Sequence, residues 1–220
     1  MADRKDAAET PPVFGADFIA RFRDLVRWRR DVRRFRPDPV PAALIDRLLD
    51  IAALSPSVGN AQPWRFVAVE SAERRARIVA DFEAANRDAA ARYADAQADL
   101  YRQLKLEGLR LAPVQLAVFS DEATGQGAGL GRQTMPETLS YSVVGAIQTL
   151  WLAARAEGLG MGWVSILHPD AMNELLDVPQ DWRFIAYLCL GWPAEEHLDP
   201  ELERAGWQAR TEESRRLLTR

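Results

Sequence analysis

A nearly continuous apolar run close to the C-terminal end restricts how this chain can fold. The run reads Phe184-Ile-Ala-Tyr-Leu-Cys-Leu190. A strand with one face in water alternates apolar and polar residues, whereas a strand buried on both faces carries apolar residues without alternation. We therefore expect residues 184–190 to form a central strand of a sheet that helices flank. Cys189 is the only cysteine of the chain and lies in this run, which indicates a buried thiol and no disulfide.

The remaining elements follow from apolar periodicity and from turn-forming residues. Helices are expected at 18–26, 44–52, about 73–110, 142–157 and 169–176, and further strands at 66–69, 114–119 and 162–167. Gly158-Leu-Gly160 suits a left-handed cap after the helix that ends at 157. Helices that alternate with few strands predict an α+β fold around a small mixed or antiparallel sheet. The periodicity gives no order for the strands.

The chain is expected to form one domain. Residues 1–15 are polar, contain two prolines and lack periodicity, so they are predicted to be a loose N-terminal arm. Residues 16–220 are expected to fold as a single unit, since 48% of the whole chain is apolar and 27% is charged. The tail at 192–220 is polar and has no core pattern. We expect it to pack on another surface, such as a second subunit.

Charge and composition exclude several functions. A formal net charge of -4 gives no basic field, which argues against nucleic acid or an anionic membrane as a partner. No apolar run approaches the roughly 20 residues that cross a bilayer, and no signal-peptide core follows the N-terminus, so the protein is expected to be cytoplasmic. His168 and His197 are far apart in the sequence, and with one cysteine they predict no metal site.

Three arginines and an acid stand together in Arg29-Arg30-Asp31-Val32-Arg33. Guanidinium groups bind phosphate oxygens in pairs and stay charged at any working pH, so the arginines indicate a phosphate clamp. A solvated basic patch at a helix end is the alternative. Asp31 would repel a phosphate. Its side chain is therefore expected to point elsewhere, unless it merely pairs with a neighbouring arginine.

A second motif, Ser55-Pro-Ser-Val-Gly-Asn-Ala-Gln-Pro-Trp64, contains more amides than a plain loop needs. The side chains of Asn60 and Gln62 donate and accept hydrogen bonds at once, which suits the hydroxyl chain and pyrimidine edge of a flavin. The third motif is Gly160-Met-Gly-Trp-Val-Ser165. Its glycines either cap the preceding helix or let backbone N–H groups approach a flat ring.

The three motifs, in this order and spacing, resemble the nitroreductase family over about residues 18–210. The resemblance implies an α+β homodimer that binds flavin mononucleotide (FMN) in clefts at the subunit interface. It implies that Arg29, Arg30, Arg33 and Arg210 hold the phosphate end, and that the second and third motifs lie against the flavin. The residues assigned to FMN in this way are Arg29, Arg30, Asp31, Val32, Arg33, Ser57, Asn60, Gln62, Gly162, Trp163, Val164, Ser165 and Arg210.

One position departs from ordinary nitroreductases, in which the first motif reads Arg-Arg-Ser-x-Arg. Asp31 stands at the serine position, and in this the sequence resembles the 5,6-dimethylbenzimidazole synthase branch of the family. That resemblance implies that Asp31 and Ser165 act on the flavin. It also implies a helical lid, to which we assign residues 86–111, with Leu104 in contact with FMN.

The branch resemblance implies an oxygen-dependent fragmentation of reduced FMN. The products would be 5,6-dimethylbenzimidazole, the lower ligand of cobalamin, and erythrose 4-phosphate. A closed lid would deny nicotinamide its stacking place, so a separate NAD(P)H-flavin reductase would supply reduced FMN as the substrate. Two alternatives remain open, namely an NAD(P)H-dependent nitroreductase or flavin reductase and a non-catalytic flavin-binding protein.

Overall fold

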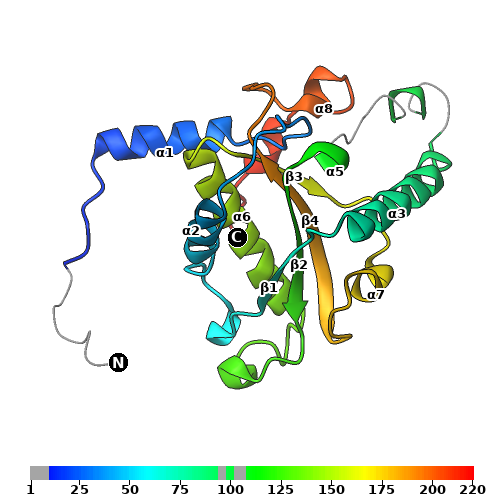
Figure 1. The fold of residues 1–220 in the computed structure, drawn as a ribbon. Helices are drawn as coiled ribbons and strands as arrows, with labels where there is room; N and C mark the ends of the chain where they lie inside the picture. Colours follow the sequence, from blue (N-terminus) through cyan, green and yellow to red (C-terminus); the bar gives the residue numbers. More distant parts are fainter. Residues whose placement is uncertain (1–9, 94–97, 102–107) are drawn as a thin grey trace.

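The fold is built on an antiparallel sheet. The computed structural model describes residues 10–93, 98–101 and 108–220. The described strands lie in the order β1-β2-β4-β3, and every neighbouring pair is antiparallel (Figure 1). Their bounds are β1 Trp64–Ala68, β2 Val114–Asp121, β3 Gly160–Val164 and β4 Trp182–Gly191. The apolar run lies in β4, which pairs with a strand on each side. The prediction of a central strand is confirmed.

Helices cover both faces of the sheet, and the fold is α+β (Figure 1). The described α-helices are α1 Ala16–Trp28, α2 Ala42–Ala52, α3 Ala72–Ala90, α5 Gly108–Leu111, α6 Thr138–Ala156, α7 Met172–Leu176 and α8 Glu201–Arg204. Short 3-10 turns are η1 Val58–Asn60, η2 Gln126–Gly129, η3 Pro169–Ala171 and η4 Glu212–Arg215.

The side chains of β4 alternate between two hydrophobic clusters. Leu188 and Leu190 pack with α2 and α6 on one face, whereas Tyr187 and Cys189 pack with α3, α5 and α7 on the other. Because both faces are covered, the strand needs no polar side and its sequence shows no alternation. Cys189 is a buried free thiol, as expected.

Helix α6 is the main support of one face of the sheet. Eight of its side chains are buried, and it ends where Gly158 adopts a φ of 80°. The N–H of Leu159 then donates to the carbonyl of Ala154, which closes the last turn. The predicted left-handed cap is confirmed, although the helix begins at Thr138 and not at 142.

Two elements differ from the sequence prediction. The strand expected at 162–167 lies at Gly160–Val164, where its residues pair with β4 from Gly191 to Tyr187. The helical region expected from about 73 to 110 is interrupted: α3 ends at Ala90, the described residues 98–101 are helical again, and α5 begins at Gly108. Helix propensity alone did not indicate this break, because alanine and arginine continue through it.

Helix α1 projects from the rest of the molecule (Figure 1). Within the described residues it buries none of its side chains, and Phe18 and Phe22 keep 49% and 47% of their surface exposed. Its apolar stripe was expected to start the folded part of the chain. Among the described residues, this stripe instead stays largely exposed. None of the helices described is long and apolar enough to cross a membrane.

Candidate functional site

The Arg29–Arg33 segment leaves α1 and runs along the open edge of β3. The N–H of Val32 donates to the carbonyl of Met161 at 3.0 Å, and the N–H of Trp163 donates to Asp31 Oδ1 at 2.9 Å. Asp31 and Met161 form a parallel bridge. One backbone contact and one side-chain contact therefore fix the Asp31 carboxylate against the edge strand.

Two glycines of β3 make room for this segment. A Cβ on Gly162 would overlap the carbonyl oxygen of Val32, and one on Gly160 would come within 2.8 Å of the Val32 side chain. Neither glycine has a positive φ, so close approach and not an unusual turn explains both. The helix cap expected from Gly160 and Gly162 is made by Gly158 instead. Val32 fills the space beside Gly160 and Gly162.

Arginines surround a cavity beside this segment. It encloses about 160 Å³ and is lined by Arg29, Arg30, Arg33 and Arg210 together with Asp31, Pro200, Glu201 and Leu202. The buried Nε of Arg29 has no hydrogen-bond partner among the described residues. Arg30 is held in place by the carbonyl of Leu198, at 2.9 Å from its Nε. Burial, and then the charge of Arg210, lower the pKa of Arg30.

This cavity fits a phosphate group. Several guanidinium groups meet there, and the buried Arg29 Nε and Arg33 Nη1 have no hydrogen-bond partner among the described residues. An anion would relieve the repulsion between these cations. Arg210 comes from the C-terminal tail, 180 positions after Arg30, yet its charge acts on both Arg29 and Arg30. The structure thus brings the four arginines that were expected at the phosphate end to one cavity.

Arg33 has a different environment from the other three arginines. Its Nε lies 3.2 Å from Asp31 Oδ2 and 3.7 Å from Glu201 Oε2. Its side chain is 12% exposed, and its buried Nη1 has no partner among the described residues. Arg33 is therefore shared between two carboxylates, and its assignment to the phosphate stays a prediction.

Asp31 combines burial with an opening toward the cavity. Its side chain keeps 37% of its surface exposed and lines the arginine-lined cavity. Burial raises the pKa of Asp31, while the hydrogen bond from Trp163 and the charge of Arg33 act in the opposite direction. A carboxyl group of this kind can exchange a proton with a bound molecule.

The end of the expected lid lies beside Asp31. Gly108 and Leu109 of α5 line a second, small cavity with Asp31 and the β3 residues from Gly162 to Val164. A Cβ on Gly108 would stand 3.0 Å from the ring of Phe35, so α5 packs closely on the segment that follows Arg33. Leu104, the expected lid contact, lies outside the described residues.

An aromatic cluster connects the region before α5 to the C-terminal tail. Trp207 lies 5.4 Å from Tyr93 and 6.1 Å from Tyr101 between ring centres. The hydroxyl of Tyr101 donates to the side-chain oxygen of Asn86 at 2.8 Å. The tail was expected to pack on another surface, and part of that surface belongs to its own chain.

The second motif lies at the other end of the sheet. Asn60 and Gln62 both have positive φ values, 54° and 46°, and the Gln62 amide donates to Asn60 Oδ1 at 3.0 Å. Ser57 Oγ accepts a hydrogen bond from the backbone N–H of Gln62. This strained loop is an unusual feature for non-glycine residues and is typical of functional sites.

Pairing along the sheet measures how far this loop lies from Asp31. The loop leads into Trp64, which pairs with Ser120 and through it with Arg183, whereas Asp31 bridges to Met161, the partner of Leu190. Seven residues of strand span roughly 23 Å. Within one chain, the two groups of expected FMN contacts are thus separated.

Other expected site residues have mixed positions. Trp163 is half-buried and contributes its N–H to Asp31, whereas Val164 is buried in the core. Ser165 is exposed just after β3. Glu201 and Trp207 were missed, because no local motif marks residues that meet the site only through the tail. Among the described residues no group of His, Cys, Asp or Glu could hold a metal.

Comparison with known proteins places this geometry in context. The sequence pattern of the Nitroreductase family matches residues 26–192. A protein of Rhodospirillum rubrum named 5,6-dimethylbenzimidazole synthase is 59% identical over 201 residues, which are 91% of this chain and 95% of that protein. A Rhodobacter capsulatus protein of the same name is 53% identical over 84% of this chain and 89% of its own length.

Solved structures agree with the fold. Oxidised iodotyrosine deiodinase bound to FMN and 3-iodo-L-tyrosine has a TM-score of 0.68 and is 26% identical, with 80% of this chain and 91% of that chain covered. A nitroreductase family protein from Streptococcus pneumoniae has a TM-score of 0.65 at 20% identity, over 90% of this chain and all of the other. The second likeness concerns the fold alone.

Proposed function

We propose, from the premise that this chain belongs to the nitroreductase family, that it fragments reduced FMN with oxygen to 5,6-dimethylbenzimidazole and erythrose 4-phosphate. Its relatives' names and the family support flavin-dependent 5,6-dimethylbenzimidazole synthesis in general. The specific fragmentation is the proposal. FMN would be the substrate, reduced by a separate NAD(P)H-flavin reductase, and oxygen the co-substrate.

The position of Asp31 is the observation that carries the proposal. Its carboxylate is fixed at 2.9 Å from the Trp163 N–H and opens onto the arginine-lined cavity. A phosphate held by Arg29, Arg30 and Arg210 would leave the ribityl chain to extend past this carboxylate. Ordinary nitroreductases have a serine at this position. A serine hydroxyl cannot accept a proton as a carboxylate does.

Each part of the site would have a defined task. The arginines would bind the phosphate and neutralise its charge. Asp31 would take up or return a proton at the ribityl carbon next to the ring, and its raised pKa brings it closer to neutral pH. Segment 86–111 would exclude water and nicotinamide from the ring. Ser165 would orient groups or relay protons.

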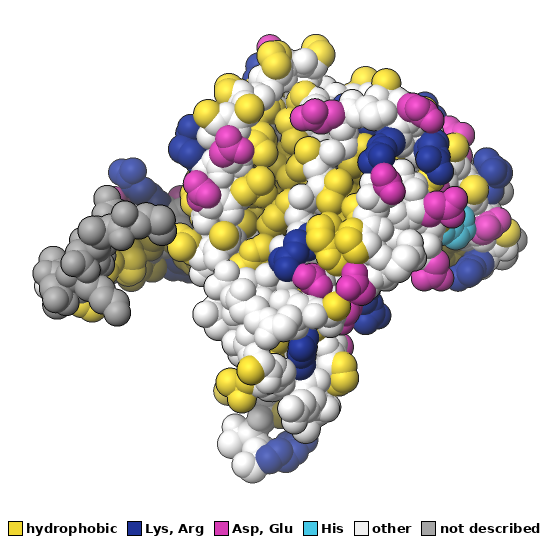
Figure 2. Space-filling model, turned by 60° about the horizontal axis from the view of Figure 1, so that its bottom comes forward, with side chains coloured by type: hydrophobic (Ala, Val, Ile, Leu, Met, Phe, Trp, Pro, Cys, Tyr) yellow, Lys and Arg dark blue, Asp and Glu magenta, His cyan; other side chains and the backbone are white. Residues whose placement is uncertain are grey.

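A second copy of the chain would complete the site. Asp31 and the Asn60 loop lie at opposite ends of the sheet, so the loop that contacts a given flavin would come from the partner subunit. Large apolar side chains remain exposed on α1 and α6, among them Phe18, Phe22 and Tyr141. Figure 2 shows a broad gathering of hydrophobic side chains near the centre of one face. Such a surface is typical of an interface.

The test is a product analysis with the purified protein. Chemically reduced FMN and protein are mixed without oxygen, then exposed to air, and the products are separated and identified. We expect 5,6-dimethylbenzimidazole in proportion to the FMN consumed. NADH or NADPH with FMN and no reductase should give negligible nicotinamide oxidation. Robust nicotinamide turnover would favour a nitroreductase, and unchanged FMN after repeated reduction and oxidation would favour a binding protein.

A further inference from the structure

We propose that Glu201, in the C-terminal tail, is a positioning residue that competes with Asp31 for the guanidinium group of Arg33 and so sets how readily Asp31 takes up a proton. The effect of Glu201 on catalysis rests on the proposed function. Its structural part concerns only the ionisation of Asp31 and can be measured without turnover.

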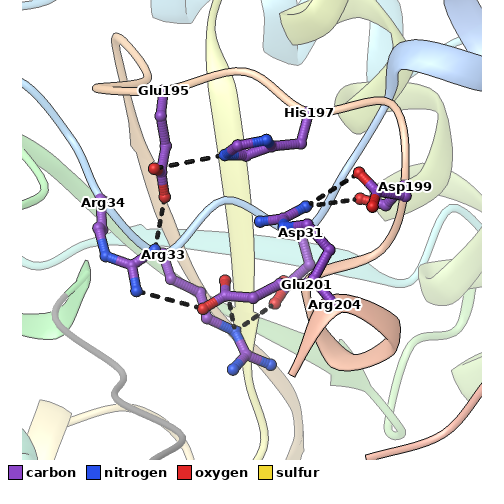
Figure 3. Close-up of polar contacts among 8 residues, drawn as sticks. All are labelled: Asp31, Arg33, Arg34, Glu195, His197, Asp199, Glu201 and Arg204. Atoms are coloured by element: carbon purple, nitrogen blue, oxygen red, sulfur yellow. Dashed lines mark hydrogen bonds and ion pairs between the residues drawn. The ribbon is translucent and has the colours of Figure 1, made fainter. Parts of the chain in front are cut away.

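The competition is visible in the contacts of a single nitrogen. Arg33 Nε lies 3.2 Å from Asp31 Oδ2 and 3.7 Å from Glu201 Oε2, so the two carboxylates approach the same donor (Figure 3). The side chains of Arg33 and Glu201 are 12% and 20% exposed. Screening by solvent is therefore weaker for this triad than for an ion pair on the surface.

Glu201 is itself held in place by a second arginine. Its Oε1 lies 3.3 Å from Arg34 Nη2, while Arg34 Nη1 binds Glu195 Oε1 at 2.5 Å. Glu195 in turn lies 3.3 Å from His197 Nε2 (Figure 3). Because one oxygen of Glu201 is taken by Arg34, the other stays directed at Arg33.

Two effects of Glu201 on Asp31 have the same sign. The negative charge of Glu201 repels the ionised form of Asp31, and Glu201 also takes up part of the positive charge of Arg33 that would stabilise that form. Both effects raise the pKa of Asp31, in the same direction as burial. Removal of the charge at position 201 should therefore make Asp31 a weaker base.

The other groups near Asp31 do not substitute for Glu201. On its own segment, Arg29 and Arg33 are cations, and the Trp163 N–H of β3 favours the ionised carboxylate. From β4, Cys189 faces Asp31, but burial raises the pKa of this thiol to about 12, so it is neutral. Arg30 and Arg210 line the same cavity with positive charge. Asp199 lines a neighbouring pocket with Asp31 but pairs with Arg204. Among the described carboxylates other than Asp31, Glu201 is the one that approaches Arg33.

The experiment compares Glu201→Gln with Glu195→Gln. Both variants remove a carboxylate that binds Arg34, but only Glu201 also approaches Arg33. The pH dependence of 5,6-dimethylbenzimidazole formation is measured for each. The titration of Asp31 is followed by carbon-13 resonance of labelled aspartate carboxyls, assigned by the signal missing in Asp31→Asn. Thermal unfolding establishes that each variant is folded.

We expect Glu201→Gln to move the Asp31 titration and the acid limb of the rate profile down by about one pH unit. Glu195→Gln should leave both within a few tenths of a unit, and Glu201→Asp should return most of the shift. An unchanged Asp31 titration in Glu201→Gln, or an equal shift in Glu195→Gln, overturns the inference. If the unaltered protein forms no product, the proposed function fails, and the carboxyl titration alone decides the role of Glu201.

Discussion

The most informative backbone change is Gly162→Ala, which tests why β3 carries a glycine beside Asp31. The new Cβ would overlap the carbonyl oxygen of Val32. Relief of the overlap requires the Asp31 segment to move by about 1 Å, because non-bonded atoms cannot approach more closely. That movement lengthens two contacts, Val32 N to Met161 O at 3.0 Å and Trp163 N to Asp31 Oδ1 at 2.9 Å.

The expected magnitude follows from these two contacts. A displacement of about 1 Å at a catalytic group can lower the rate roughly 100-fold. Loss of hydrogen bonds at about 1 kcal/mol each, with some strain, should lower the unfolding free energy by about 1–3 kcal/mol. The nearest atoms to the added Cβ belong to Val32 and Asp31 and not to the arginines of the cavity, so the proposed phosphate site should remain. FMN affinity should therefore fall less than about tenfold.

The assay measures product formation, FMN affinity and thermal unfolding for Gly162→Ala and a matched control. Gly125→Ala is suitable, because its Cβ would meet nothing within 4 Å and its φ of −79° suits alanine. The control should keep its activity. If Gly162→Ala forms product within about threefold of the parent rate, the segment is not positioned as we describe. If FMN affinity falls by the same factor as activity, Gly162 makes room for the flavin ring and not for the Val32 carbonyl.

Three further outcomes are expected. Trp207→Ala should weaken reduced-FMN binding about five- to tenfold and speed proteolysis of the 86–111 segment, since it removes aromatic contacts worth about 1 kcal/mol or more near Arg210; equal proteolysis rates would count against the link. Phe22→Asp in α1 should yield a monomer that no longer binds FMN, and light scattering that still reports a dimer would exclude this helix from the interface. Burial raises the pKa of Asp31 above 3.8, so its ionisation destabilises the fold as pH rises past that value; Asp31→Asn should therefore unfold at a higher temperature at pH 7, and this gain should vanish below about pH 3.8.

Local sequence patterns predicted the parts of the fold that depend on local chemistry. The apolar run of β4 indicated its central place because both faces of that strand are buried. Gly158 indicated the end of α6 because only glycine adopts its φ without strain. Ser57, Asn60 and Gln62 were recognised as a special loop, and two of them do adopt positive φ values.

Contacts between residues far apart in the sequence could not be predicted from local patterns. The strand expected at 162–167 begins at Gly160, because Gly160 pairs with Gly191 of β4, a contact between distant parts of the chain. Arg33 was assigned to the phosphate, together with Arg29 and Arg30, from guanidinium chemistry and from the family resemblance. Its pairing with Glu201 depends on how the C-terminal tail folds back, and nothing in the tail's own sequence indicated that contact.

The link between this fold and the proposed reaction is the Asp31 carboxylate, and Asp31→Asn tests it directly. The change keeps the size of the side chain but removes its ability to take up a proton. The arginine cavity remains, so FMN affinity should stay the same or rise slightly as a negative charge is lost.

In a single turnover with reduced FMN and air, the products of Asp31→Asn and of the unaltered protein are quantified side by side. We expect 5,6-dimethylbenzimidazole formation to fall by about 10²–10⁴-fold, since a positioned acid or base contributes that much. Oxidised FMN and hydrogen peroxide should appear in its place. If Asp31→Asn forms 5,6-dimethylbenzimidazole at close to the parent rate, Asp31 is only a structural partner of the arginines, and the account of the site is wrong.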